Sequence, residues 1–93
     1  MQDNKSRHSQ ICKELNDIYA AKNHDYGDSF HSTYQKLGII SAVTRISDKC
    51  ERLLSLCSKS EDERRIKNES IEDTLMDLAN YSIMSVMEMR GIS

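Results

Sequence analysis

Residues 39–57 read IISAVTRISDKCERLLSLC, and this stretch decides the fold class because its apolar side chains recur at helical spacing. The apolar positions are separated alternately by four and three residues, which is the spacing of a coiled-coil-like seam. They are Ile39, Val43, Ile46, Cys50, Leu53 and Cys57, and Ile40 and Leu54 widen the stripe. The pattern predicts a long helix, and it predicts that the two cysteines are buried on the seam.

Further helical patterns lie on both sides of this stretch. The first predicted helix runs from about Ser6 to Lys22, with its apolar residues on one face. The second is expected from Ser32 to Cys57, with an interruption at Gly38. The third begins near Asn68 or Ser70 and continues to about Arg90, where Gly91 suits a C-cap. The sequence therefore predicts three main helices.

Residues 23–30 (NHDYGDSF) are predicted to break the chain between the first two helices. Gly27 supplies backbone freedom, and Asp and Asn side chains favour turns. Residues 58–69 contain a single apolar residue and are predicted to form a linker whose acidic half is solvated. His24 and His31 have no third ligand at suitable spacing, so a metal role is not expected for them.

The composition agrees with an all-α fold. The 93 residues include no proline, three glycines and a single phenylalanine, which favours long helices over a β-sandwich. Hydrophobic residues make up 38% and charged residues 30%, so residues 1–93 are expected to form one globular domain. Because so short a chain buries only a small core, we expect a small helical bundle that is completed by oligomerisation.

The same numbers exclude several classes of protein. The three cysteines show neither even pairing nor Cys-x-x-Cys spacing, which argues against a disulfide scaffold or zinc finger and for a reducing compartment. No apolar run approaches the roughly 20 residues that span a bilayer, and the first residues lack an apolar signal core. We therefore expect a cytoplasmic protein without a membrane partner. The net charge of −2 argues against nucleic acid as a partner.

Acidic residues on the last two helices form the first candidate site. Asp73 and Asp77 lie four residues apart and share one stripe of the third helix, while Asp48 and Glu51 lie on the second. If these helices pack antiparallel, the four carboxylates can converge on Mg²⁺, which prefers oxygen ligands. A solvated, charged helix face is the alternative explanation. The basic residues placed to meet the phosphates of a ligand are Arg45, Lys49 and Arg52.

Three segments together resemble a known family: residues 22–30 (KNHDYGDSF), 45–53 (RISDKCERL) and 69–81 (ESIEDTLMDLANY). Their order and spacing are similar to the phage-associated family called nucleotide modification associated domain type one, over roughly residues 10–90. That family looks like a branch of the MazG and dimeric dUTPase superfamily of all-α nucleoside-triphosphate pyrophosphohydrolases. The resemblance implies a helical bundle that forms dimers or tetramers, binds a nucleotide between helices and holds Mg²⁺ with acids.

The acidic motifs depart from the superfamily pattern, which is Glu-x-x-Glu on one helix and Glu-x-x-Asp on the next. The first becomes Asp48-x-x-Glu51 in this chain, and the second becomes Asp73-x-x-x-Asp77, because position 74 is threonine. The longer spacing changes the angle between the two carboxylates of the second motif by about 100° around the helix axis.

The resemblance implies a Mg²⁺-dependent pyrophosphohydrolase that converts a nucleoside triphosphate into a monophosphate and pyrophosphate. The four acids would then be catalytic and hold the metal, which activates a water for attack on phosphorus. The alternatives are a non-catalytic sponge that sequesters a host antiviral nucleotide signal, and an inhibitor that binds another protein. The residues expected to bind the nucleotide are Asp25, Tyr26, Asp28, Phe30, Arg45, Lys49, Arg52, Asn80 and Tyr81.

Overall fold

A computed structural model describes residues 3–58 and 64–91, with the backbone alone for residues 24–27 and 64–67. Three α-helices follow one another along the chain: α1 (Asn4–Leu37), α2 (Ile39–Cys57) and α3 (Arg64–Met89). The described residues contain no β-strand. The prediction of an all-α helical domain is confirmed.

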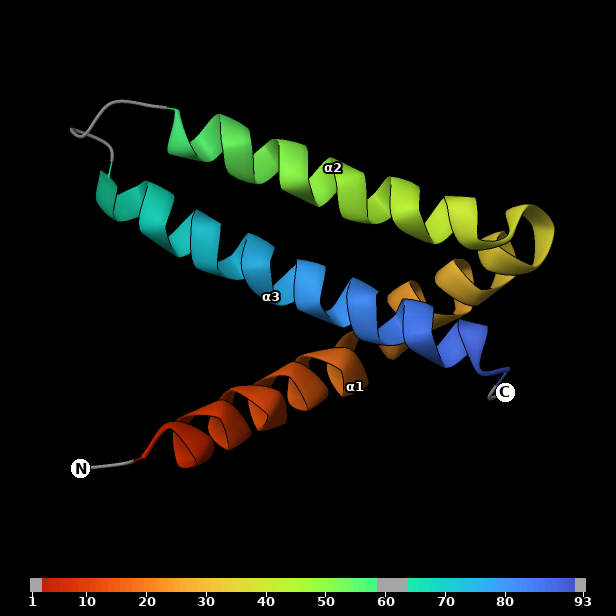
Figure 1. Cartoon of the computed structure of the whole chain (residues 1–93), viewed down its shortest axis with the longest axis horizontal. Helices are drawn as coiled ribbons and strands as arrows, with labels where there is room; N and C mark the ends of the chain where they lie inside the picture. The colour runs from red at the N-terminus through yellow and green to blue at the C-terminus, as the bar shows by residue number, and fades with distance from the viewer. Residues whose placement is uncertain (1–2, 59–63, 92–93) are drawn as a thin grey trace.

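The helices α2 and α3 lie side by side and antiparallel, as in a helical hairpin (Figure 1). Helix α1 crosses this pair and contacts both of its members. The N-terminal end of α1 points away from α3, so that α1 and α3 diverge towards the N-terminal end of α1 (Figure 1). The arrangement leaves the α2–α3 pair covered by α1 over only part of its surface.

Helix α1 is continuous, so the break predicted over residues 23–30 and the helix end predicted at Lys22 are both wrong. The physical reason is a stripe of apolar residues that runs through the predicted break. Leu15, Tyr19, Phe30 and Tyr34 are separated by 4, 11 and 4 residues, which places them on one face of a continuous helix. Phe30 is only 3% exposed, and both tyrosines pack on the core around it. Burial of this stripe outweighs the local turn preference of Asn, Asp and Gly.

The boundary between the first two helices lies at Gly38, where the sequence indicated an interruption. Its dihedral angles, φ 75° and ψ −159°, belong to a region that only glycine adopts without strain. Helix α2 therefore begins at Ile39 and not at Ser32. At the other end of the chain Gly91, with φ 65°, follows the end of α3 as predicted.

The predicted linker is shorter than expected, because α3 begins at Arg64 and not near residue 68 or 70. Residues 64–69 thus belong to a helix, although the sequence assigned them to the linker. Residues 59–63 lie outside the described part of the chain.

The core is small and lies where the three helices meet. Phe30 from α1, Ala42 from α2 and Met84 from α3 are at most 3% exposed, and three tyrosines pack against them. Asn80 of α3, 2% exposed, donates a hydrogen bond of 3.1 Å from Nδ2 to the backbone carbonyl of Leu15. This bond ties α3 to the middle of α1.

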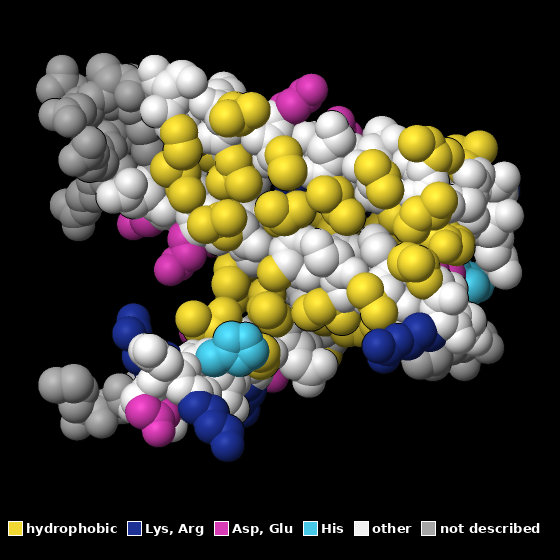
Figure 2. Space-filling view, viewed as in Figure 1, with side chains coloured by type: hydrophobic (Ala, Val, Ile, Leu, Met, Phe, Trp, Pro, Cys, Tyr) yellow, Lys and Arg dark blue, Asp and Glu magenta, His cyan; other side chains and the backbone are white. Residues whose placement is uncertain are grey.

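Much apolar surface remains uncovered. Figure 2 shows apolar side chains gathered in rows over α2 and α3, and further ones over α1. Cys50 and Cys57 are exposed, so the prediction that they are buried is wrong for the single chain. Among the described residues, no helix combines the length and the apolar character of a membrane span. The apolar side chains with at least 45% exposure are Ile11, Leu37, Ile39, Ile40, Val43, Leu54, Leu75, Ile83, Val86 and Met89.

Candidate functional site

Two aromatic rings from helices far apart in the sequence stack at the centre of the molecule. The ring centroids of Phe30 in α1 and Tyr81 in α3 are 5.8 Å apart, and the ring planes are inclined by 23°. This separation and near-parallel orientation fit a stacked aromatic pair. The stack joins the first of the three family-like segments to the third.

Helix α2 places two cations against this aromatic pair. The guanidinium carbon of Arg45 lies 5.6 Å from the centroid of Phe30, and Nζ of Lys49 lies 5.9 Å from the centroid of Tyr81. Both distances are within the range in which the negative face of a ring attracts a cation. The second family-like segment therefore joins the same cluster.

An ion pair closes the cluster on the side of α3. Nζ of Lys49 lies 3.4 Å from Oδ2 of Asp77, and the two side chains are 27% and 29% exposed. Residue spacing explains why these side chains of α2 and α3 face each other. Arg45 and Lys49 are one turn apart on α2, as are Asp77 and Tyr81 on the antiparallel α3. We call these five residues, Phe30 included, the aromatic–cation cluster.

The predicted acidic site is not assembled within one chain. Asp77 pairs with Lys49, whereas Asp48, Glu51 and Asp73 are exposed. Among the described residues, no group of three or more His, Cys, Asp or Glu side chains could hold a metal ion. The described carboxylates of a single chain therefore do not gather around one point, as the predicted four-acid site would require.

The other predicted ligand-binding residues lie outside the cluster. Asp28 and Arg52 are exposed, and the buried amide of Asn80 is used to hold α1. The side chains of Asp25 and Tyr26 lie outside the described residues.

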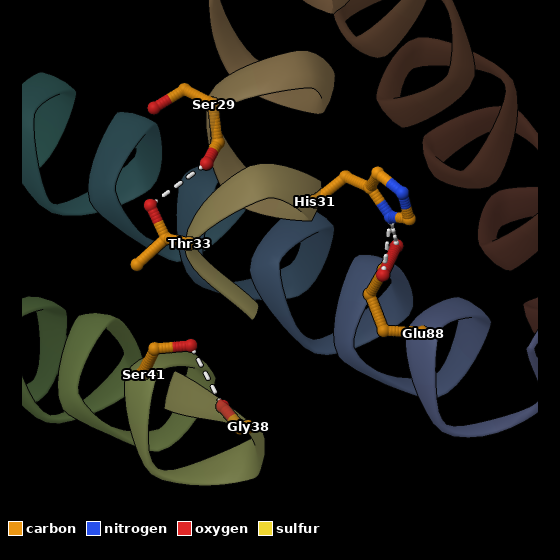
Figure 3. A network of polar contacts seen from close by, with 6 residues as sticks. All are labelled: Ser29, His31, Thr33, Gly38, Ser41 and Glu88. Carbon is orange, nitrogen blue, oxygen red and sulfur yellow. Dashed lines mark hydrogen bonds and ion pairs between the residues drawn. The ribbon is translucent and has the colours of Figure 1, made fainter. Parts of the chain in front are cut away.

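One contact was not indicated by the sequence. The Nδ1 atom of His31 in α1 lies 2.6 Å from a carboxylate oxygen of Glu88 in α3 (Figure 3). The Glu88 side chain is only 13% exposed. Because 57 residues separate the partners, no local spacing could reveal the pair. It fixes the C-terminal half of α1 on the end of α3.

The diverging halves of α1 and α3 enclose an open groove of about 580 Å³. Its apolar lining residues include Ile11, Ile18 and Leu75. Acidic residues stand along it from both helices, so a bare phosphate would meet negative charge there. Those acidic residues are Glu14, Asp17, Glu72 and Asp73.

In a comparison with known protein families, residues 22–89 match a family model described as nucleotide modification associated domain 1. Comparisons with curated proteins and with solved structures give no significant match. The matched residues include all three segments that build the aromatic–cation cluster and cover well over half of the chain. The chain therefore belongs to the nucleotide modification associated domain 1 family.

Proposed function

We propose that this protein binds a nucleotide and holds its phosphates with Arg45 and Lys49. One observation carries the proposal: residues from all three family-like segments meet in one contact cluster that presents two cations. Phe30 and Tyr81 are 51 positions apart in the sequence, so local structure alone does not bring these segments together.

The chemistry of the cluster suits a phosphate. A guanidinium group donates two parallel hydrogen bonds to phosphate oxygens, and an ammonium group adds a compact positive charge. The rings under Arg45 and Lys49 restrict their movement, so less side-chain entropy is lost when a ligand binds. The exposed Arg52 lies a further turn along α2 and can meet a second phosphate.

The carboxylate of Asp77 affects how strongly Lys49 can bind a phosphate. It already neutralises part of the charge of Lys49, so an incoming phosphate competes with it at 3.4 Å. Removal of the carboxylate would leave Lys49 with a larger uncompensated charge. We therefore expect Asp77→Asn to tighten phosphate binding or leave it unchanged, in contrast to the loss that a metal-binding carboxylate would give.

Within the nucleotide-binding proposal, sequestration is favoured over hydrolysis. A pyrophosphohydrolase needs acids gathered around a metal ion, and three of the four expected acids are exposed, while the fourth pairs with a lysine. A binding protein needs only the cations and the apolar surroundings. The sponge for a host nucleotide signal is thus our first proposal, and the Mg²⁺-dependent pyrophosphohydrolase is the competing function.

A mixed-nucleotide assay separates the two functions. The protein is incubated with ribo- and deoxynucleoside triphosphates, cyclic di- and trinucleotides and ADP-ribose derivatives, with Mg²⁺ or with a chelator, and is then removed by filtration. Sequestration predicts that one nucleotide disappears from the filtrate in both conditions and is recovered intact after denaturation. Release of a monophosphate and pyrophosphate only with Mg²⁺ would establish the hydrolase instead.

Variants test the site itself. Arg45→Ala and Lys49→Ala should each weaken binding roughly tenfold or more, because a charge-assisted hydrogen bond contributes about 1.5–3 kcal/mol. Lys13→Ala is the matched control, since Lys13 is also a helical lysine paired with an aspartate but is 79% exposed on α1. Unchanged binding in both cluster variants, with folding verified by circular dichroism, would place the nucleotide elsewhere.

A further inference from the structure

We propose that the open groove between α1 and α3 binds a cationic amphipathic helix of a partner protein. The groove is formed by residues between positions 11 and 18 of α1 and between positions 72 and 76 of α3, and its volume is about 580 Å³. Its lining residues are separate from those of the aromatic–cation cluster, so the proposal does not depend on nucleotide binding.

Both walls of the groove offer apolar surface to a helix. Ile11 and Ile18 are seven residues apart on α1, which places them two turns and about 10.5 Å apart along its axis. Leu75 and Met76 provide apolar surface on the wall formed by α3. Ile11 and Leu75 are each 49% exposed, so half of their surface is open to a partner. Apolar side chains at positions i and i+7 of an incoming helix have the same repeat along its axis.

The remaining lining side chains are all acidic. Helix α1 contributes Glu14 and Asp17, and α3 contributes Glu72 and Asp73. All four residues are exposed. Lys13 lies 3.3 Å from Asp17, but the two side chains are 79% and 64% exposed, so this pair is weak and an incoming cation can replace it. The groove therefore combines an apolar surface with negative charge on both walls.

Charge complementarity indicates which occupant fits this groove. The acidic side chains would repel phosphates, nucleic acids and anionic lipid surfaces. A helix whose apolar stripe is flanked by Lys or Arg meets both requirements, because its apolar face leaves water while its cations face the carboxylates. There is room for it, since α1 and α3 diverge at this end and Figure 2 shows a hollow between them with apolar and acidic side chains beside it.

A basic residue limits the length of the acidic stretch. Arg7 lines a neighbouring hollow of about 410 Å³ that shares Ile11 and Glu14 with the groove. Arg7 would repel the cations of a helix extended in that direction. Because α1 completes about two turns from Ile11 to Ile18, we expect a bound segment that contacts the groove over about two to three helical turns.

Fluorescence anisotropy with a synthetic probe tests the proposal. The probe is a fluorescein-labelled peptide of about 18 residues, with Leu at the i, i+3, i+4 and i+7 positions of a helix and Lys and Ala on its other faces. The wild-type chain should bind this peptide, and increasing salt should weaken the binding. A peptide with Glu in place of Lys should bind at least about tenfold more weakly, as should a scrambled Lys peptide without an apolar face.

Matched variants separate the groove from the overall negative charge of the chain. A Glu14→Gln, Glu72→Gln chain should bind the Lys peptide about fivefold more weakly, because two exposed charge pairs are lost. An Asp48→Asn, Glu51→Gln chain loses the same charge at exposed positions of α2 and should bind it as the wild type does. Leu75→Ser should also weaken binding about fivefold, since it removes apolar contact area without disturbing a buried side chain.

Three results would overturn the proposal. The first is equal binding of the Lys and Glu peptides, and the second is wild-type affinity in both groove variants. The third is a groove filled by a second copy of the chain. In that case the Lys peptide would not bind, and Leu75→Ser would convert a dimer into monomers in sedimentation velocity.

Discussion

Truncation of Phe30 should remove a large part of the stability of this protein. The side chain is 3% exposed and lies among Ala42 and Met84, with the Tyr81 ring 5.8 Å away. Replacing a buried phenylalanine by alanine costs about 3–5 kcal/mol, a figure that already contains the loss of the aromatic contact. A domain of this length has a free energy of unfolding of only about 5–14 kcal/mol.

The assay is thermal and urea unfolding followed by circular dichroism at a fixed protein concentration, because association adds stability that depends on concentration. With about 4–8 °C per kcal/mol for a small domain, Phe30→Ala should lower Tm by at least about 12 °C. Phe30→Leu keeps most of the volume and should lose clearly less. Leu37→Ala, at a position 63% exposed, is the control and should stay within about 0.5 kcal/mol.

A Phe30→Ala chain within about 1 kcal/mol of the wild type would refute this reasoning. It would show that Phe30 is not part of a packed core. The continuity of α1 through residues 23–30 would then lack its physical cause, because the burial of Phe30 is what outweighs the turn-forming residues before it.

Three further changes test other parts of the fold. Asn80→Ala removes the buried hydrogen bond to the Leu15 carbonyl and should lower the free energy of unfolding by about 1–3 kcal/mol, measured by urea titration. Gly38→Ala should cost about 1–3 kcal/mol in the same assay, because φ 75° strains any residue with a Cβ although nothing else lies within 4 Å. The Asp3 carboxylate accepts a hydrogen bond from the Ser6 amide, which lowers the pKa of Asp3 below 3.8. Its contribution to the start of α1 is therefore present above pH 3.8 and lost as the pH falls through the lowered pKa. In that pH range, hydrogen exchange at the Ser6 amide should accelerate relative to the exchange rate of an unprotected amide at the same pH. Asp3→Ala should abolish this acceleration.

Features of the fold that depend on neighbouring residues are predicted better from the sequence than features that depend on residues spread along a whole helix. The sequence predicts the helical apolar pattern of α2, an interruption at Gly38 and a C-cap at Gly91, since each of these depends on residues close together in the chain. The sequence predicts a break instead of a continuous α1 because residues 23–28 favour turns when only neighbouring residues are considered. The stripe from Leu15 to Tyr34 carried the opposite signal across the same segment.

The sequence names Arg45, Lys49, Phe30 and Tyr81 as ligand-binding candidates, but it does not predict that they meet in one cluster, as they do in the structure. That these residues bind a nucleotide stays a prediction. The four predicted carboxylates do not converge within one chain. Residue spacing along a helix shows which residues share a face, but it does not show how two helices are rotated relative to each other. That rotation brings Lys49 to Asp77 and leaves Asp48 in solvent.

The most direct test of nucleotide binding at the aromatic–cation cluster is a ¹H–¹⁵N NMR spectrum recorded with the pooled nucleotide panel. The proposal predicts shift changes at residues 42–52 of α2 and 77–81 of α3, and their disappearance in an Arg45→Ala, Lys49→Ala chain that keeps its helical signal. Changes confined to the groove between residues 11–18 and 72–76, or none with the whole panel, would contradict it.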